Sequence, residues 1–367
     1  MPLPTPPDLV HRAVRAVNLR GDAPLIALGE GGLLCPRGGF AIDPWRPADV
    51  AVLTHAHSDH TRAGSRLYYC ALASLDLCRQ RLPPGAEVRG VPYGEPFRLG
   101  ETTVSLHPAG HILGSAQVRV EADGEVWVFS GDYKRDPDPT CAPFEVVPCD
   151  VFITESTFAL PVYRWRPGPA IAADIYAWWQ ENARLGRASV LLCYAVGKAQ
   201  RALAELAAYT DQPVWLHGAV EAMMPAYRKA GVPMLPTQPV GGAPVGQSWA
   251  GSLVVAPPSA EASPWIKRFG ECETAFASGW MRVRGNRRRR GSDRGFVLSD
   301  HADWPGLLDT VHATGASRIL ATHGFGDTLA RHLRDLGLDA QPLATRRPEP
   351  ESVEQAASAD PHAEAGA

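Results

Sequence analysis

The sequence predicts an α/β protein in which two sheet-rich segments precede a parallel α/β insert and further short strands follow it. Short apolar stretches separated by turn residues occupy 24–53 and 88–132, a pattern typical of short strands. From about residue 161 strand-like and helix-like segments alternate, which indicates a parallel sheet with crossover helices. The 367 residues include 35 Gly and 34 Pro, so frequent turns argue against a helical bundle or coiled coil. This length predicts one large or two modest domains.

The first sheet-rich segment contains four apolar stretches and the second contains four more. The first four are PLIALG, GLLCP, GGFAIDP and DVAVLTH. The others are PFRLG, TTVSLHPAGH, SAQVRVEADG and EVWVFSGD. Asp123-Gly124 stands between the last two of these, and Asp-Gly between alternating apolar residues predicts a hairpin.

The insert and the last part of the chain are expected to alternate strands with helices. Helices are predicted at 170–185, 197–210 and 219–231. Strands are predicted at 189–195, 214–218 and 253–258. After Gly295, the strands in GFVLSDH and RILATHG each lead into a loop that bears His and then into a helix. Residues 346–367 are rich in Ala, Pro and Glu, which predicts a disordered tail.

Composition excludes several classes of protein. The apolar runs are far shorter than the roughly 18 residues of a membrane span, and MPLPTPPDLV does not resemble a signal peptide. Seven Cys without a CxxC pair argue against a disulfide framework and a thiolate zinc site. We therefore expect a cytoplasmic protein without membrane contact.

The formal charge of −3 conceals a basic cluster. Residues 281–294 (MRVRGNRRRRGSDR) contain seven Arg and one Asp, whereas the tail from Arg346 is acidic. One basic cluster in an otherwise neutral body favours a local polyanion site over general adhesion to nucleic acid. A solvated loop, or an arm that aids solubility, is the alternative.

The strongest chemical signal is the string Thr54 to His60, THAHSDH, after the apolar run VAVL. The side chains of His55 and His57 project to the same side at the end of a strand and can bind one ion. Asp59 and His60 begin the following turn and can reach a second ion. Imidazole and carboxylate ligands without thiolate suit a catalytic Zn²⁺ site, or Mn²⁺ and Fe²⁺ less often. A chance cluster of surface histidines is the alternative.

Further candidate ligands also follow apolar strands. His111 lies in HPAGHILGS, Asp132 ends VWVFSGD, and His323 ends RILATHG. Ligands collect where loops leave a rigid scaffold. Each residue alone is better explained as a structural polar group, but together they give two imidazole-rich sets with one carboxylate left to bridge them.

These motifs resemble the metallo-β-lactamase superfamily, whose HxHxDH signature is present as His55, His57, Asp59 and His60. Within it the sequence is similar to the β-CASP nucleases, and especially to the bacterial ligase-associated DNA exonucleases, over about residues 20–340. The strings that carry this similarity are IDPWRPAD, THAHSDH, PAGHILGSAQV, SGDYKRDPDPTC, YAVGKAQR, APPS and ASGWMRVRGNRRRRGSDRGFVLSDHADW.

The resemblance implies a metallo-β-lactamase αββα sandwich with an inserted α/β β-CASP domain. Residues 1–160 and 295–345 would form the sandwich, 161–294 the insert and 346–367 the tail. It also implies two divalent metal ions, Zn²⁺ in first place and Mn²⁺ as the alternative.

The resemblance assigns roles to individual residues. One ion takes His55, His57 and His111, and the other takes Asp59, His60 and His323. Asp132 bridges the two ions, and Asp43 supports the metal-binding loop without binding an ion. Glu155 and His301 form the pair in which an acid holds an imidazole near the leaving group. Turn-forming and helix-capping roles are the alternatives for Asp43 and His301. The predicted catalytic residues are Asp59, Asp132, Glu155 and His301.

Substrate-binding residues are predicted on the insert and after it. Lys198 stands where a strand gives way to a helix, so it is a candidate phosphate ligand, with solvation of the helix start as the alternative. The other candidates are Ser278, Arg282, Arg284, Arg287 and Arg288. The aromatic rings of Trp280 and Trp304 are candidates for base stacking, although burial is the better explanation for each.

The resulting hypothesis is a two-metal phosphodiesterase that acts as a 5′→3′ exonuclease on single-stranded DNA in repair, together with a DNA ligase and a helicase. A β-CASP ribonuclease is the alternative. RNA-processing relatives carry His at the position of His323, where eukaryotic crosslink-repair relatives usually carry an apolar residue. A small-molecule hydrolase is disfavoured by the insert and the Arg cluster, and an inactive scaffold by the complete ligand set.

Overall fold

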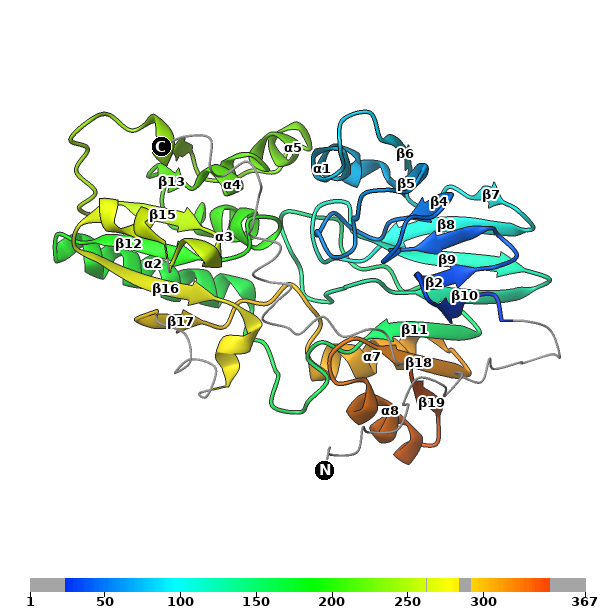
Figure 1. Ribbon diagram of the computed structural model, residues 1–367. Coiled ribbons are helices and arrows are strands. Elements are labelled where there is room, and N and C mark those ends of the chain that lie inside the picture. The colour runs from blue at the N-terminus through cyan, green and yellow to red at the C-terminus, as the bar shows by residue number, and fades with distance from the viewer. Residues whose placement is uncertain (1–23, 262, 284–291, 344–367) are drawn as a thin grey trace, which may run out of the picture.

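The computed structural model describes residues 24–261, 263–283 and 292–343, in which the strands form three sheets (Figure 1). The predicted tail and three predicted substrate ligands, Arg284, Arg287 and Arg288, lie outside the described residues. The α/β class predicted from the sequence is confirmed.

The first sheet contains six strands in chain order. They are β1 (Ala27–Gly29), β2 (Gly32–Cys35), β3 (Phe40–Ile42), β4 (Val50–Val52), β5 (Leu67–Ala71) and β6 (Glu87–Val91). The first three strands pair antiparallel, and pairing from β3 to β6 is parallel. The carboxyl ends of β3 and β4 therefore lie at the same edge, where Asp43 and the histidine motif follow.

The second sheet has seven strands in the order β19-β18-β11-β10-β9-β8-β7. They are β7 (Phe97–Leu99), β8 (Thr102–Pro108), β9 (Ala116–Ala122), β10 (Glu125–Phe129), β11 (Val151–Glu155), β18 (Arg318–Thr322) and β19 (Asp339–Pro342). Asp123 and Gly124 join β9 to β10 with φ values of 52° and 78°. This is the predicted hairpin, and positive φ at both turn residues is what a type I′ turn requires.

The two sheets pack face to face, and helices cover their outer faces. The core between them includes Val52, Leu106, Val118 and Phe129. Helix α1 (Leu75–Arg81) covers the first sheet. Helices α7 (Trp304–Thr314) and α8 (Gly326–Asp335) cover the second. This part of the chain is therefore a four-layer sandwich of helix, sheet, sheet and helix.

The third sheet is wholly parallel, as the alternating pattern predicted, and has the order β14-β13-β15-β12-β16-β17. Its strands are β12 (Ala188–Leu192), β13 (Val214–Leu216), β14 (Thr237–Pro239), β15 (Leu253–Ala256), β16 (Cys272–Ala277) and β17 (Arg294–Phe296). Helices α2 (Gly168–Arg184) and α3 (Lys198–Leu206) pack on one face. In the chain this sheet lies between β11 and β18, which are neighbours in the second sheet.

The helix predicted at 219–231 is two helices in the structure, α4 (Gly218–Glu221) and α5 (Met224–Lys229). Pro225 accounts for the break, because proline lacks an N–H and its ring clashes with the carbonyl four residues earlier. The helix predicted at 197–210 ends at Leu206. Short 3₁₀ helices are η1 (Leu72–Ser74), η2 (Val240–Gly242), η3 (Pro258–Ala260), η4 (Pro264–Phe269) and η5 (Gly279–Arg282).

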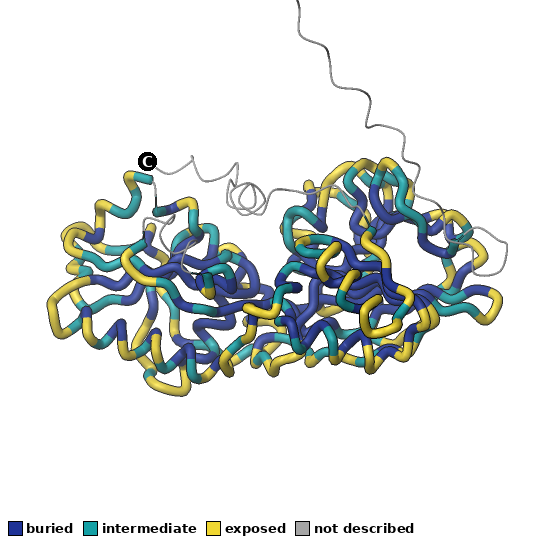
Figure 2. Tube along the Cα trace, turned by 90° about the horizontal axis from the view of Figure 1, so that it is seen from below, coloured by how far each residue is buried: buried dark blue, intermediate teal, exposed yellow. Residues whose placement is uncertain are grey.

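The molecule has two halves, the sandwich and the part built on the third sheet. Buried chain is concentrated inside each half and where the two meet, while exposed residues gather at the outer turns (Figure 2). Among the described residues no helix is long and apolar enough to cross a membrane. The domain boundaries given by the family resemblance stay predictions.

Candidate metal centre

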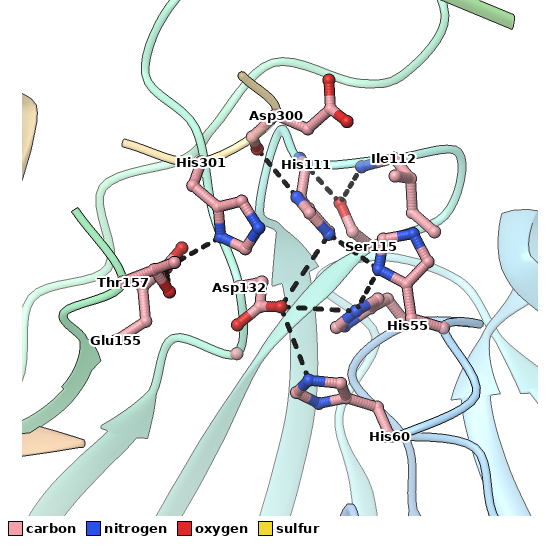
Figure 3. Close-up of polar contacts among 12 residues, drawn as sticks. His55, His60, His111, Ile112, Ser115, Asp132, Glu155, Thr157, Asp300 and His301 are labelled. Atoms are coloured by element: carbon pink, nitrogen blue, oxygen red, sulfur yellow. Dashed lines mark hydrogen bonds and ion pairs between the residues drawn. The ribbon is translucent and has the colours of Figure 1, made fainter. Parts of the chain in front are cut away.

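Four side chains from three loops converge beside the edge where β4 and β10 end. His55 and His57 follow β4, His111 follows β8 and Asp132 follows β10. The side chains of His55, His111 and Asp132 are buried and point toward one another (Figure 3). The sequence prediction for one ion named these three imidazoles with Asp132, and the structure brings all four residues together, with one ligand atom of each within 4.8 Å of the others.

The outward nitrogens of the three imidazoles have fixed partners. His57 Nε2 lies 3.2 Å from the carbonyl oxygen of Val196, and His111 Nδ1 lies 2.7 Å from that of Asp300. A carbonyl oxygen only accepts, so both nitrogens carry hydrogen. His55 Nδ1 lies 3.0 Å from Thr54 Oγ1, whose hydrogen goes to a carboxylate, so it is also a donor.

The inward nitrogens consequently carry no hydrogen, and their lone pairs face one another. His57 Nδ1 lies 3.0 Å from His55 Nε2 and 3.1 Å from His111 Nε2. Burial lowers the pKa of His57 to about 4, and burial with the neighbouring imidazoles holds the pKa of His55 and of His111 well below the ordinary value. Neutral rings with lone pairs this close repel unless a cation lies between them. The residues present therefore fit a divalent ion such as Zn²⁺.

Asp132 stands between the two sides of the site. One of its oxygens, Oδ2, lies 3.4 Å from His60 Nε2, 3.6 Å from His55 Nε2 and 3.9 Å from His111 Nε2. Burial alone would raise the pKa of this carboxyl, but His60 and His301 hold it well below its ordinary value. Asp132 is therefore an anion at neutral pH, and its position suits a ligand shared by two cations.

His60 occupies the side of Asp132 opposite His111. Its Nδ1 donates to Asp43 Oδ2 at 2.8 Å, and its Nε2 lies 3.5 Å from Asp59 Oδ2. Although burial opposes the charged form, the surrounding carboxylates raise the pKa of His60 well above its ordinary value. A proton on Nε2 offsets their charge here, and a metal cation would supply the same charge.

Asp43 and His323 complete this side with unusual backbone conformations. Asp43 also accepts from Thr54 N at 2.8 Å and from Thr54 Oγ1 at 2.6 Å, so its carboxylate ties the start of the histidine loop to His60. The ring of His323 lies 5.9 Å from the ring of His60 between centroids. Both Asp43 and His323 have positive φ, 43° and 58°. Of the predicted second ligand set, His60 lies 3.4 Å from Asp132, and Asp59 and His323 lie beside His60. Among the described residues these three side chains do not form a compact group like that of the first set.

Glu155 holds His301 on a third side of Asp132. Glu155 ends β11, and its Oε2 accepts from His301 Nδ1 at 2.8 Å and from Thr157 Oγ1 at 2.6 Å. Burial alone would lower the pKa of His301, but the charges of Glu155 and Asp132 raise it to about 9. Among the described residues, Asp132, Glu155 and His301 form a second group with ligand atoms within 4.8 Å of one another.

The predicted substrate-binding residues that the structure describes have varied surroundings. Lys198 is buried, its Nζ lies 3.3 Å from Asp300 Oδ2, and it faces the ring of Tyr194 at 4.1 Å. Ser278 is buried and accepts from Trp280 N at the start of η5. Arg282 is exposed, and its Nε donates to the carbonyl of Val162. Contact of these residues with substrate stays a prediction.

Three contributors to the site were missed in the sequence. Thr54 orients His55, Val196 orients His57 through a main-chain oxygen, and Asp300 orients His111 in the same way. Any residue type can supply a main-chain acceptor, so the sequence could not predict the contact of Val196 with His57. The same holds for the main-chain oxygen of Asp300, and its place directly before His301 in the string SDH is the one hint in the sequence.

Curated proteins similar to this chain carry names of nucleic-acid enzymes. A probable DNA ligase of Opitutus terrae is 32% identical over 311 residues, which cover 84% of this chain and 30% of that protein. Ribonuclease TTHA0252 of Thermus thermophilus is 29% identical over 150 residues, 32% of this chain and 34% of that protein. An RNase J-like protein of Methanocaldococcus jannaschii is 24% identical over 204 residues, 48% of each chain.

The chain spans about a third of the length of the first two of these relatives. No family model matches the sequence. The relatives named ribonucleases agree with the nuclease resemblance of the motifs, and the ligase-associated subgroup stays a prediction.

Proposed function

We propose that this chain is a metal-dependent nuclease of the metallo-β-lactamase type, with residues 161–294 as an inserted β-CASP domain. The observation that carries the proposal is the set of three inward imidazole lone pairs around Asp132. His55, His57 and His111 would hold one ion, Asp59, His60 and His323 a second, and Asp132 both. Zn²⁺ is the first candidate and Mn²⁺ the second.

Two divalent ions held by these residues would neutralise charge on a phosphate and lower the pKa of water. The protein's own residues contribute orientation and proton transfer. Asp43 fixes the tautomer of His60 by accepting from Nδ1, and the carbonyls of Val196 and Asp300 do the same for His57 and His111. Such outer contacts keep the ligand nitrogens aimed at the centre.

His301 is proposed as the acid that protonates the leaving oxygen of a phosphodiester. A pKa of about 9 keeps its ring protonated at neutral pH. Glu155 accepts the hydrogen bond from Nδ1, so Nε2–H remains for the substrate. The rings of His111 and His301 lie 4.7 Å apart between centroids, so this donor stands beside the ligand cluster.

A polyanionic substrate is supported by a cavity lined by four arginines, two of which flank Trp165. A cavity of about 500 Å³ is lined by Arg164, Arg166, Arg282 and Arg294, with Asp174 and Glu181 also on its wall. Trp165, between the first two arginines, donates from its indole nitrogen to the carbonyl of His301 at 2.8 Å. Arginine beside a scissile group positions a nucleic-acid backbone.

We further propose 5′→3′ exonucleolytic action on single-stranded DNA in repair, in functional association with a ligase and a helicase. The resemblance to ligase-associated exonucleases supports this, as does the relative named a probable DNA ligase, which matches most of this chain. RNA processing is the second candidate, because other relatives are named ribonucleases. The chemistry proposed for Asp132 and its neighbours needs no 2′-hydroxyl group, so it does not distinguish DNA from RNA.

The test is a time course on end-labelled single-stranded DNA of both polarities, beside RNA of the same sequence, with Zn²⁺ or Mn²⁺. We expect DNA to shorten from its 5′ end, and Asp132→Ala to abolish cleavage while the fold survives. Glu121→Ala, which removes a half-exposed carboxylate on β9, is the control. Preferential cutting of RNA would replace the DNA proposal, and full activity of Asp132→Ala would refute the bridging role.

A further inference from the structure

Six charged side chains form a buried cluster behind the candidate metal centre, and none of them is assigned a role by the metal chemistry. They are Lys134, Asp138, Lys198, Arg201, Glu205 and Asp300. Every one of these side chains is 5% exposed or less. Three cations and three anions balance, which is the condition for burying charge at acceptable cost.

Arg201 is the centre of this cluster. Its Nε lies 2.9 Å from Glu205 Oε1 and 3.5 Å from Asp138 Oδ2. Its Nη1 donates to the carbonyl of Ser299 at 2.6 Å and lies 3.5 Å from Asp300 Oδ1. One guanidinium therefore ties three separate segments together: α3, the loop after β10, and the stretch that leads to His301.

Asp300 connects the cluster to the candidate metal centre. Its carboxylate lies between Arg201 and Lys198. Its main-chain oxygen accepts the Nδ1 hydrogen of His111 at 2.7 Å, and Figure 3 shows this contact on the side away from Asp132. The next residue is His301. Displacement of Asp300 would thus rotate one candidate ligand and move the proposed acid together.

The surroundings of Lys198 argue against direct contact with substrate. Its ammonium group is 3% exposed and paired with Asp300. The amino end of α3 is also closed, because Gln200 Oε1 accepts from Gly197 N at 2.8 Å. A phosphate would have to displace these partners, so the residues of α3 are placed to hold protein segments instead.

We propose that Arg201 is a positioning residue: through Asp300 it fixes the ring of His111 for metal binding and the place of His301 for proton transfer. Lys198 assists as the second cation on the same carboxylate. The part of the inference that concerns His301 rests on the proposed function. The part that concerns metal binding depends only on the ligand cluster.

The test compares Arg201→Met and Arg201→Lys with Arg318→Met. Arg318 is a mostly buried arginine at the start of β18, paired with Asp339, so its loss controls for removing a similar side chain from the sandwich. Zn²⁺ affinity is measured by chelator competition, and the site is observed by the absorption spectrum of the Co²⁺-substituted protein. Thermal unfolding reports stability separately.

We expect Arg201→Met to raise the Zn²⁺ dissociation constant by about 10-fold, the lower end of the range for loss of an outer partner because Arg201 acts one contact farther out, and to alter the Co²⁺ spectrum. Arg201→Lys should restore part of the affinity, and Arg318→Met should leave both readouts at the wild-type value. Unchanged Zn²⁺ affinity and spectrum in folded Arg201→Met would overturn the inference. Should that variant not fold, wild-type affinity in Arg201→Lys would overturn it equally.

Failure of the proposed function is distinguishable from failure of this inference. Wild-type protein that binds Zn²⁺ but cuts neither DNA nor RNA would refute the nuclease proposal and leave the affinity comparison intact. Wild-type protein that cuts nucleic acid, beside variants of Arg201 with unaltered metal binding, would refute the positioning role alone.

Discussion

At the residue scale, the centre is defined by which nitrogen of each imidazole carries hydrogen. His57 presents Nδ1 to the centre, whereas His55 and His111 present Nε2. The difference follows from which nitrogen the outer partner engages: Nε2 in His57, and Nδ1 in His55 and His111. A substitution that alters an outer partner is therefore expected to act on metal binding without touching a ligand.

The first prediction concerns His301 and pH. His301→Ala should lower kcat by about 10² to 10⁴-fold, the range for loss of a general acid, while metal content stays unchanged. Because the acid must be protonated, wild-type activity should fall as pH rises through about 9. Glu155→Gln should move this fall to lower pH, because it removes the carboxylate charge that raises the pKa of His301. A pH profile identical to that of the wild-type protein would contradict the assignment.

At the element scale, the loops after β4, β8 and β10 are held against one another by close backbone contacts. Gly131, just before Asp132, has φ 56°, and a Cβ there would meet Thr54 Cβ at 2.7 Å. Thr54 in turn precedes His55. The spacing between the histidine loop and Asp132 thus depends on a residue without a side chain.

The second prediction is a pair of Gly→Ala variants. Gly131→Ala should lower metal affinity and stability, since the new methyl group forces Thr54 away from the loop of Asp132. Gly124→Ala is the matched control, because Gly124 also has positive φ, 78°, but has open space at the Cβ position. It should cost only the backbone strain of about 1 kcal/mol and leave metal affinity unchanged. Metal titration and thermal unfolding of both variants check this; equal metal affinities would argue against the spacing role.

The elements predicted from sequence were those with strong local patterns. The hairpin at Asp123-Gly124, the parallel third sheet and the two strands that lead to His301 and His323 all had such patterns. Strands β5, β6, β14, β16 and β19 were missed. β14 carries Pro239, which is tolerated because the strand lies at a sheet edge, and β16 begins with partly buried residues.

The candidate ligands were predictable because His and Asp at strand ends are rare and chemically specific. Their outer partners were not, because main-chain oxygens and long-range ion pairs depend on how distant segments meet. Lys198 is the clearest example. Its place at a strand-to-helix junction suggested a phosphate ligand, yet its partner, Asp300, lies a hundred residues later in the chain.

At the scale of the whole molecule, the third sheet and the sandwich contribute jointly to the site. Val196, which precedes α3, orients His57, and Arg201 within α3 holds Asp300. Farther out, Arg164 and Arg282 are exposed on the wall of the arginine-lined cavity. Under the proposed function they would extend the binding of a nucleic-acid strand away from His301.

The third prediction tests this extension. The double variant Arg164→Ala, Arg282→Ala should weaken binding of single-stranded DNA and reduce the dependence of log K on log salt by about 0.7 for each phosphate that no longer has an arginine partner. Fluorescence anisotropy in the absence of metal measures both without cleavage. The control is Arg89→Ala, Arg98→Ala, exposed arginines on β6 and β7. Equal salt slopes in the two double variants would show that the cavity does not bind the strand.

The chain passes from the sandwich to the third-sheet half and back again in two segments, and these segments lie side by side near His301. Trp304 N donates to Tyr163 O, and Trp165 N donates to Asp303 Oδ2, so the outgoing and returning segments are bonded to each other. Atoms near a pivot travel least when two bodies rotate. A change in the angle between the halves would therefore spare the bond of His301 to Glu155. It would act first on the carbonyl of Val196, which reaches His57 from the opposite half.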